Sequence, residues 1–236
     1  MYRQVMSEIP VAAKHSPLSR TQSAAMAEYY RERAPRYDVL YKTPEWREDL
    51  AWLKAWVADH TARRSVLEVA AGTGFWTEAA AAGATAITAT DCNPEVLALA
   101  SNRGFGRHVA FVVADAYGLP SFERTFGAGM AHLWWSHVDK LREHQFLRDF
   151  TSRLRRGAEL LMIDQLHVDG YSSPAFRRDR VGNRYELRTL EDGRVFQIIK
   201  NYPTPEELQA TMNRFCEAVQ ITSLRYFWAL RGRVRA

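Results

Sequence analysis

The 236-residue sequence has only two cysteines, Cys92 and Cys216, which are too few and too unpatterned for a disulfide framework or a zinc site. It lacks an apolar run of the ~18–20 residues that a membrane helix needs. Residues 1–26 carry scattered charges and no apolar block of ~7–15 residues, as a secretory signal would have. We therefore expect a cytoplasmic protein without a membrane segment. We also expect no bound metal, since no His/Asp cluster has ligand spacing.

Segregated charge is also scarce. The formal net charge is +5, but arginines and carboxylates alternate along most of the chain. Arg153, Arg155 and Arg156 are predicted to close a helix, whose C-terminal end favours cations. A second arginine excess, at 177–184, more often marks a solvated face than a nucleic-acid surface. We therefore do not expect nucleic acid as a partner. With 47% hydrophobic and 25% charged residues, the chain suits one globular α/β domain.

The most informative segment is 65–77, SVLEVAAGTGFWT, in which an apolar strand, a Gly-rich turn and the start of a helix follow one another. Gly72 and Gly74 have no Cβ, so a ligand can approach the backbone N–H groups of the turn closely. About seventeen residues further on, a second predicted strand ends at Asp91. That spacing is typical of a carboxylate that binds a ribose.

Two ligands, a dinucleotide and S-adenosylmethionine, are candidates for this turn. The third Gly of a dinucleotide fingerprint is replaced by Thr77. Glu68, directly before the turn, would repel a pyrophosphate but attract the ammonium of a methionine moiety. The segment 68–74 resembles motif I of the class I S-adenosylmethionine-dependent methyltransferases, Glu/Asp-x-Gly-x-Gly-x-Gly, with Ala70 in place of the first Gly.

Further segments resemble the motifs of this family in the same order. Asp91 matches the acid that hydrogen-bonds the ribose hydroxyls, and Asp115 matches the one that faces the adenine amino group. Residues 127–137 resemble the fourth strand with the loop that enters the active site, and 154–164 resemble the turn before the fifth strand and that strand. The resemblance thus implies methyl transfer from S-adenosylmethionine.

The resemblance also implies the fold class, which is α/β and Rossmann-like. We expect a seven-stranded, mostly parallel sheet of order 3-2-1-4-5-7-6, with the last strand antiparallel and helices on both faces. A single methyltransferase domain would cover 1–236. Its parts would be an N-terminal helical lid (1–60), a cofactor-binding core (61–166), an active-site insertion with a hairpin after strand five (167–202), and the final helix and strands (203–236).

Sequence patterns place several helices and a hairpin. Asn93 and Pro94 are an N-cap and a first-turn proline, and Thr204 opens a capping box. Glu191-Asp192-Gly193 separates two β-like runs. The helices are predicted over 24–33, 44–60, 94–101, 141–156 (stopped by Gly157) and 204–216, and the hairpin strands over 185–190 and 194–199.

The N-terminal segment 29–38 resembles the YY-x-x-R-A-x-x-YD stretch that folds over the cofactor in many small-molecule methyltransferases. Taken together, the resemblances name a set of residues expected to bind S-adenosylmethionine. This set comprises Tyr30, Tyr37, Glu68, Ala70, Gly72, Thr73, Gly74, Trp76, Asp91, Cys92, Asp115, Ala116 and His132.

Catalytic candidates are fewer, because in-line methyl transfer depends mainly on positioning. His137, expected to start the helix after strand four, and His132, at the strand end, are possible general bases. A structural hydrogen bond is the alternative reading for His137. Trp134, Trp135 and Tyr29 are candidate substrate contacts, with core or lid packing as the alternative for each ring.

Three functions are open. The leading one is methylation of an O or N nucleophile of a small-molecule metabolite. An RNA or protein methyltransferase is the second, although the loop after strand four has neither an Asn/Asp-Pro-Pro-Tyr motif nor a cysteine. A non-catalytic S-adenosylmethionine-binding subunit is the third. The expected state is a monomer or a homodimer.

Overall fold

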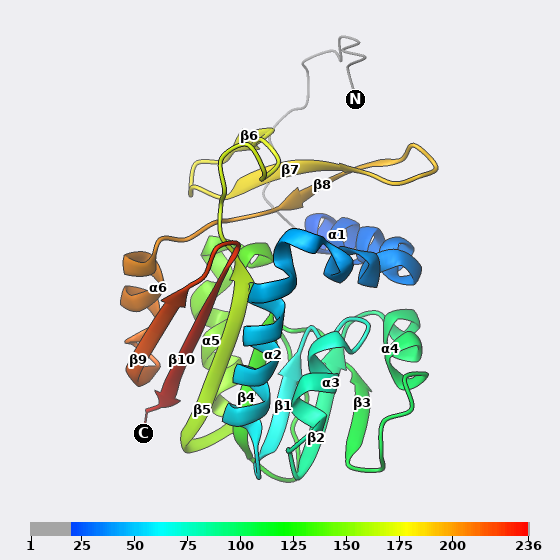
Figure 1. The fold of residues 1–236 in the computed structure, drawn as a ribbon. Coiled ribbons are helices and arrows are strands. Elements are labelled where there is room, and N and C mark those ends of the chain that lie inside the picture. The colour runs from blue at the N-terminus through cyan, green and yellow to red at the C-terminus, as the bar shows by residue number, and fades with distance from the viewer. Residues whose placement is uncertain (1–19, 236) are drawn as a thin grey trace.

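The computed structural model describes residues 20–235 and has a seven-stranded sheet at its centre (Figure 1). The strand order is β3-β2-β1-β4-β5-β10-β9, which confirms the predicted order with β10 and β9 as strands seven and six. Strands β1 to β5 are parallel, whereas β10 is antiparallel to both neighbours. The strands are β1 (Ser65–Val69), β2 (Ala86–Asp91), β3 (Val109–Val113), β4 (Phe126–His132), β5 (Leu154–Gln165), β9 (Cys216–Ser223) and β10 (Phe227–Val234).

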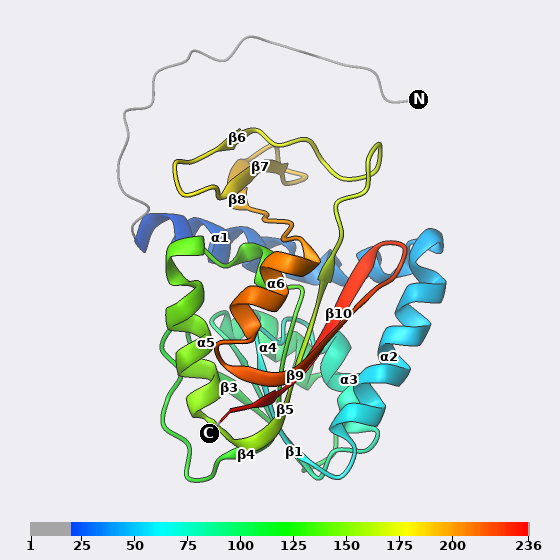
Figure 2. The ribbon, with the colours of Figure 1, turned by 90° about the vertical axis from the view of Figure 1, so that its left-hand side faces the viewer.

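Helices cover both faces of this sheet (Figures 1 and 2). One face carries α2 (Arg47–Thr61), α3 (Phe75–Ala81) and α4 (Pro94–Ser101), and the other carries α5 (Glu143–Ser152) and α6 (Pro205–Met212). An apolar core lies between the sheet and each helical layer. In α2, for example, Leu50, Leu53 and Val57 share one helical face and are all buried.

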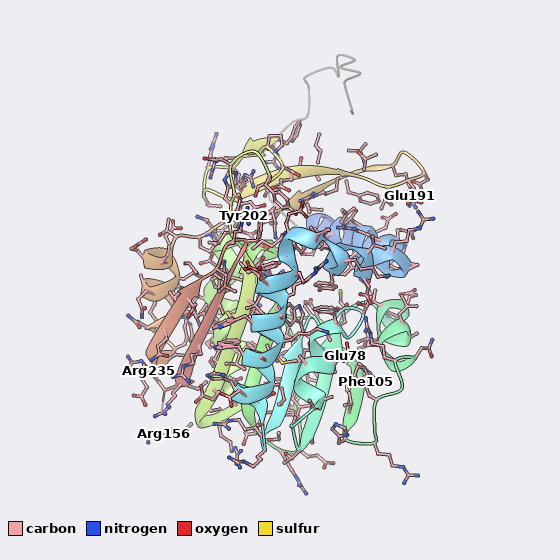
Figure 3. All side chains as sticks on the ribbon, in the orientation of Figure 1. Glu78, Phe105, Arg156, Glu191, Tyr202 and Arg235 are labelled. Carbon is pink, nitrogen blue, oxygen red and sulfur yellow. The ribbon has the colours of Figure 1, made fainter. Side chains whose placement is uncertain are left out.

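The helix predicted over 141–156 is wrong at both ends. A short 3₁₀ turn, η4 (Lys140–Arg142), precedes α5, and β5 already starts at Leu154. Leu154 is buried and pairs with Phe126 of β4, so a tertiary contact overrides the helical pattern. Gly157 has φ +72° and lies within β5 rather than stopping a helix. Arg156 is therefore an exposed strand residue at the sheet edge far from the cap (Figure 3).

A separate layer, which we call the cap, lies over the carboxyl ends of the parallel strands (Figure 1). Its lower part is α1 (Arg20–Arg33), followed by two 3₁₀ segments, η1 (Ala34–Lys42) and η2 (Pro44–Trp46). Its upper part is a three-stranded sheet of order β6-β7-β8. The predicted hairpin is confirmed as β7 (Arg184–Thr189) and β8 (Val195–Ile199), while β6 (Arg177–Arg178) was not expected.

Apolar packing joins the two parts of the cap. Tyr29 of α1 packs on Phe196 of β8 with ring centroids 5.7 Å apart. Tyr29 belongs to a third, small apolar cluster with the fully buried Tyr185 and Ile198, and the partly buried Phe196 packs against this cluster. The hairpin is thus anchored on α1 by a core of its own.

Ion pairs on the outside of the cap connect the same elements. Arg194 bonds to Glu28 at 3.3 Å and to Glu32 at 2.8 Å, both on α1. Arg36 pairs with Glu191 at the hairpin tip (Figure 3). All these side chains are at least one-third exposed, so each pair contributes little stability in water.

Within residues 20–235, no helix is both long and apolar enough to span a membrane. Most of the stretch 1–26, which has no apolar block of a secretory signal in its sequence, lies outside the described residues, as does the start of the predicted lid at 1–60.

Candidate functional site

The turn after β1 has the left-handed backbone that its glycines predict. Gly72 and Gly74 have φ values of +57° and +82°, and Ala70 has +56°. A Cβ on Gly72 would meet no atom within 4 Å, so its hydrogen leaves open space above the backbone. A Cβ on Gly74 would lie 3.1 Å from the Cβ of Ala100, so that glycine serves helix packing. The two glycines therefore have different purposes.

Asp91 fixes this turn to the end of β2. Its carboxylate accepts a hydrogen bond from the N–H of Gly72 at 3.0 Å and another from the N–H of Asn93 at 3.0 Å. Burial raises the pKa of this carboxyl group, while the two backbone donors act in the opposite direction. Each carboxylate oxygen keeps a second lone pair, which hydroxyl groups of a ligand can use.

A cavity of about 780 Å³ opens above the turn, between the sheet edge and α1. Its size lies within the range of small-molecule sites, roughly 300–1,000 Å³. Most of the residues predicted to bind the cofactor line it, including the catalytic candidate His132, as do one further catalytic candidate and one substrate candidate. They are Tyr30, Tyr37, Ala70, Gly72, Thr73, Trp76, Asp91, Cys92, Asp115, Ala116 and His132, with His137 and Trp134.

Glu68 and Gly74 are not among the lining residues. Glu68 is buried beneath the turn, where its carboxyl group accepts a 2.6 Å hydrogen bond from the hydroxyl of Thr77. Burial raises the pKa of Glu68 to about 8. At neutral pH the group is mostly protonated, so in this structure it supports the turn and the first helical turn of α3 rather than presenting a charge.

Several polar atoms of the cavity wall have no hydrogen-bond partner among the described residues. They are both ring nitrogens of His132 and the indole nitrogens of Trp76 and Trp134. Burial lowers the pKa of His132 to about 3, so the imidazole is neutral and offers one donor and one acceptor. Unpaired buried polar atoms are costly, and a polar ligand such as S-adenosylmethionine would supply partners for them.

A second cavity, of about 250 Å³, adjoins the first beneath the hairpin of the cap. Tyr30, Tyr37, Leu133 and His137 line both cavities, so the two spaces meet at these side chains. The second cavity is otherwise rich in hydroxyl and cationic groups. Its further polar lining residues include Arg33, Tyr171, Ser172, Ser173, Arg188, Lys200 and Tyr202.

His137 lies at the boundary in a fixed tautomer. It ends a 3₁₀ turn, η3 (Trp135–His137), instead of starting a helix as expected. Its Nδ1 is 2.6 Å from the carbonyl oxygen of Ile199, which can only accept, so Nδ1 carries the proton. Nε2 then accepts from the hydroxyl of Tyr30 at 2.7 Å. Burial is the main cause that lowers the pKa of His137 to about 3.

Tyr29 and Trp135, two of the substrate candidates, line neither cavity. Tyr29 is buried in the apolar cluster of the cap, and Trp135 is buried in the core beside Phe146. The packing alternative therefore describes both rings. Tyr29 and Tyr30 have different surroundings because successive positions on α1 point in different directions. Tyr29 contacts the hairpin, and Tyr30 lines the two cavities.

Sequence reasoning missed the cations of the second cavity. Arg33 is inside the YY-x-x-R-A-x-x-YD segment, but only the tyrosines of that segment are predicted site residues. Arg184 does not line this cavity; it belongs to the arginine excess expected on a solvated face, but it is buried against Glu186 at 2.6 Å. A carboxylate two residues along the same strand was the available signal, since i and i+2 share a face of a strand.

The part of the chain that the structure describes has no group of three or more His, Cys, Asp or Glu side chains placed to hold a metal ion. The acids of the site instead bond to backbone N–H groups, as Asp91 does and as Asp115 does with the N–H of Tyr117.

Comparison with known proteins matches a methyltransferase-domain family model to residues 66–157. A DhpI–SAH complex superposes with a TM-score of 0.74 at 25% identity, covering 92% of this chain and 98% of the other. A DhpI–SAM–HEP complex gives 0.73 at 26% identity, covering 90% and 98%. Burkholderia thailandensis 1,6-didemethyltoxoflavin-N1-methyltransferase shares the fold, with a TM-score of 0.62 at 18% identity, covering 98% of this chain and 94% of the other. No curated protein matches the chain.

Proposed function

The chain belongs to the class I S-adenosylmethionine-dependent methyltransferases, and from that premise we propose that it methylates an oxygen or nitrogen atom of a small molecule held in the second cavity. The observation that carries this proposal is the junction of the two cavities at Tyr30, Tyr37, Leu133 and His137. A donor in the larger cavity and an acceptor in the smaller one would meet there.

In this proposal the larger cavity binds the cofactor through groups that the chain already orients. Asp91 would accept hydrogen bonds from the ribose hydroxyls, Asp115 would bind the adenine amino group, and the turn at Gly72 would allow close approach to its backbone. When bound, S-adenosylmethionine supplies a methyl group that its sulfonium already activates. The protein then needs to align the acceptor and exclude water, which is where positioning contributes most.

The Tyr30–His137 pair would position the acceptor at the boundary. Nε2 of His137 already accepts the Tyr30 hydroxyl, and burial lowers the pKa of the imidazole to about 3. Such an imidazole is a weak base at neutral pH. We therefore favour orientation of the acceptor by the Tyr30 hydroxyl over proton storage on His137.

The size of the acceptor cavity supports a small molecule over an RNA or protein substrate. At about 250 Å³ it is below the usual range for drug-sized ligands. Its lining comes from both the cap hairpin, through Arg188, and the end of β5, through Gln165, so it lies between these elements. The DhpI structures, which match most of this chain, contain SAH or SAM with HEP, and 1,6-didemethyltoxoflavin is bound in the Burkholderia enzyme.

Methyl transfer into a host-cell extract tests this function. The protein would be incubated with extract and S-adenosylmethionine labelled in the methyl group, and the label followed in small metabolites, RNA and protein. A parallel reaction with Asp91→Ala reports transfer by other enzymes in the extract. We expect label in the metabolite fraction only. Label confined to RNA or protein would contradict the proposal, and no label despite cofactor binding would favour the non-catalytic alternative. Cytoplasmic location and a monomeric or homodimeric state stay predictions.

A further inference from the structure

Positive charge gathers around the second cavity from three separate elements. Arg33 comes from the end of α1, Arg188 from β7, and Lys200 from the segment directly after β8. Lys200 is almost fully buried, with 4% of its side chain exposed. Charged residues that increase solubility are exposed on the surface. Solubility therefore does not explain why α1, β7 and the chain after β8 bring three cations to one small cavity.

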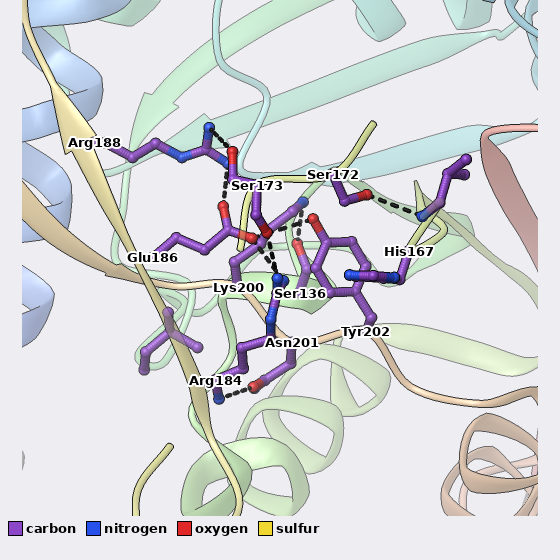
Figure 4. Close-up of polar contacts among 12 residues, drawn as sticks. Ser136, His167, Ser172, Ser173, Arg184, Glu186, Arg188, Lys200, Asn201 and Tyr202 are labelled. Atoms are coloured by element: carbon purple, nitrogen blue, oxygen red, sulfur yellow. Dashed lines mark hydrogen bonds and ion pairs between the residues drawn. The ribbon is translucent and has the colours of Figure 1, made fainter. Parts of the chain in front are cut away.

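Two carboxylates only partly balance these cations. Glu186 is fully buried and binds both Arg184 and Arg188 (Figure 4). Asp164, at the end of β5, is the partner of Lys200 at 3.2 Å. Asp164 stays ionised at neutral pH, because Lys200 and two backbone N–H groups hold its pKa below the usual range despite burial.

Arg33 has no carboxylate partner within the described residues. Its guanidinium donates to the hydroxyl of Tyr29 at 3.2 Å and lies over the ring of Tyr37, 5.3 Å from the centroid. Arg184 is buried beside the cavity without lining it, and together with the three lining cations it exceeds Glu186 and Asp164 by two positive charges. Burial lowers the pKa of Lys200, and its ion pair with Asp164 acts in the opposite direction. Within residues 20–235, these cations form three ion pairs, those of Arg184 and Arg188 with Glu186 and that of Lys200 with Asp164.

The cavity also offers hydrogen-bond donors, both on Arg188 and on neutral hydroxyl groups. Nε of Arg188 is buried without a partner in the described part of the chain. The hydroxyl of Tyr202 is 3.4 Å from Glu186, and those of Ser172 and Ser173 also line the cavity. Figure 4 shows these side chains converging beneath β7. An unbalanced charge in a buried space is costly, and a bound group of opposite charge removes that cost.

We propose that the acceptor carries an oxyanion, a phosphate or a carboxylate, and that Arg33, Arg188 and Lys200 bind this group in the second cavity. That the bound molecule is the acceptor rests on the proposed function, whereas the anion site stands on the charges alone. Because the cations exceed the carboxylates by two, a doubly charged group fits better than a singly charged one. Two guanidinium groups also suit the planar arrays of oxygens that such groups present.

Calorimetric titration with simple anions tests this inference. The protein is first saturated with S-adenosylhomocysteine, which fills the larger cavity, and then titrated at pH 8 with inorganic phosphate or with acetate. We expect one site per chain, with phosphate binding at least tenfold more tightly than acetate. Arg33→Gln should weaken phosphate binding at least tenfold, and Arg33→Lys should restore part of it.

Arg36→Gln is the matched control, because Arg36 is in the same N-terminal segment but is exposed on the outer surface of the cap. It should leave phosphate binding unchanged. Arg188→Gln gives a second test, read together with its circular dichroism, since Glu186 loses one of its partners. Absence of phosphate and acetate binding by the folded wild-type protein would overturn the inference, as would equal losses in Arg33→Gln and Arg36→Gln.

The extract experiment separates this inference from the proposed function. Metabolites would be divided into anionic, neutral and cationic pools before the labelled reaction. Label in the anionic pool supports both. Label only in the neutral or cationic pool overturns the oxyanion acceptor and leaves small-molecule methylation intact. Phosphate binding that depends on Arg33, without label in any pool, keeps the anion site and contradicts the methyl-transfer function.

Discussion

The hydroxyl of Tyr30 donates a 2.7 Å hydrogen bond to Nε2 of His137, and this bond joins the cap to the loop after β4 at the boundary of the two cavities. The other nitrogen of His137 donates to the carbonyl of Ile199, at the end of β8. One imidazole thus links α1, the cap hairpin and the edge of the sheet. Its protonation state affects both the shape of the site and the stability of the cap.

We predict that His137 stays neutral, with its proton on Nδ1, at pH 5.5. Its pKa is lowered to about 3, as is that of His132, mainly by burial. Nitrogen-15 NMR of the imidazole rings checks this directly. Each histidine is protonated more readily in the unfolded chain, at a pKa of about 6.5. Stability from both groups is therefore present above pH 6.5 and is lost as the pH falls toward 3. A charged His137 at pH 5.5, or the Nε2–H tautomer, would contradict the assignment.

Glu68 should produce the opposite pH dependence. Burial raises its pKa to about 8, so the folded protein holds a proton that the unfolded chain releases above a pKa of about 4.3. The contribution of Glu68 is complete below that value and is lost as the pH rises through 8. Glu68→Gln keeps an acceptor for Thr77 and removes the ionisation. We would measure the free energy of unfolding of both proteins with denaturant at pH 5 and pH 8. From pH 5 to pH 8, the stability of the variant relative to the wild type should rise by a few kcal/mol. The same difference in stability at both pH values would refute this.

The glycines of the turn after β1 should respond differently to the same substitution. Gly74→Ala introduces a Cβ 3.1 Å from that of Ala100 at φ +82°, so we expect a loss of stability on the order of 2 kcal/mol or more. Gly72→Ala meets no atom but covers the backbone face that we assign to the ligand. It should weaken S-adenosylhomocysteine binding more than tenfold at a stability cost of about 1 kcal/mol. Thermal melts and titrations of both variants distinguish the two roles.

Ala70 carries a strain that glycine would relieve. Its φ of +56° is a left-handed conformation that costs a residue with a Cβ roughly 1–2 kcal/mol. Glycine loses about 0.5–1 kcal/mol through its greater freedom in the unfolded chain. Ala70→Gly should therefore be neutral or more stable by up to about 1 kcal/mol. A loss of stability greater than 1 kcal/mol, measured by denaturant unfolding, would show that the methyl group of Ala70 packs favourably.

The cap should depend on its apolar cluster rather than on its ion pairs. Ile198→Ala removes buried side-chain volume between α1 and β8 and should cost on the order of 2–5 kcal/mol. Arg194→Ala breaks exposed pairs to Glu28 and Glu32 and should cost less than about 1 kcal/mol. Limited proteolysis of the hairpin gives a second readout, with faster cleavage only in Ile198→Ala. Comparable losses in the two variants would contradict this ranking.

Local signals in the sequence predicted much of the fold. The strand, turn and helix at 65–77 and the capping box at Thr204 depend on neighbouring residues, and both are present in the structure. The boundary between α5 and β5 was missed because Leu154 is fixed by Phe126, a partner 28 residues away in the chain. Helical periodicity carries no information about such a contact.

The second cavity could not be predicted for a related reason. Arg33 and Lys200 are 167 residues apart and meet only because the hairpin folds back over α1. The larger cavity, in contrast, is formed by turns at the ends of adjacent parallel strands, and motif order alone places those side by side. The sequence therefore predicts most of the residues that line the larger cavity, but not the cations that line the second cavity.

Titration of the protein with S-adenosylhomocysteine tests the central claim most directly, because methyl transfer depends on cofactor binding in the larger cavity. We predict one site per chain and at least a tenfold loss of affinity in Asp91→Ala, with Asp59→Ala as the control. Asp59 is 84% exposed and lines neither cavity. Thermal melts would confirm that both variants fold. No binding by the folded wild-type protein, or unchanged affinity in Asp91→Ala, would contradict the account.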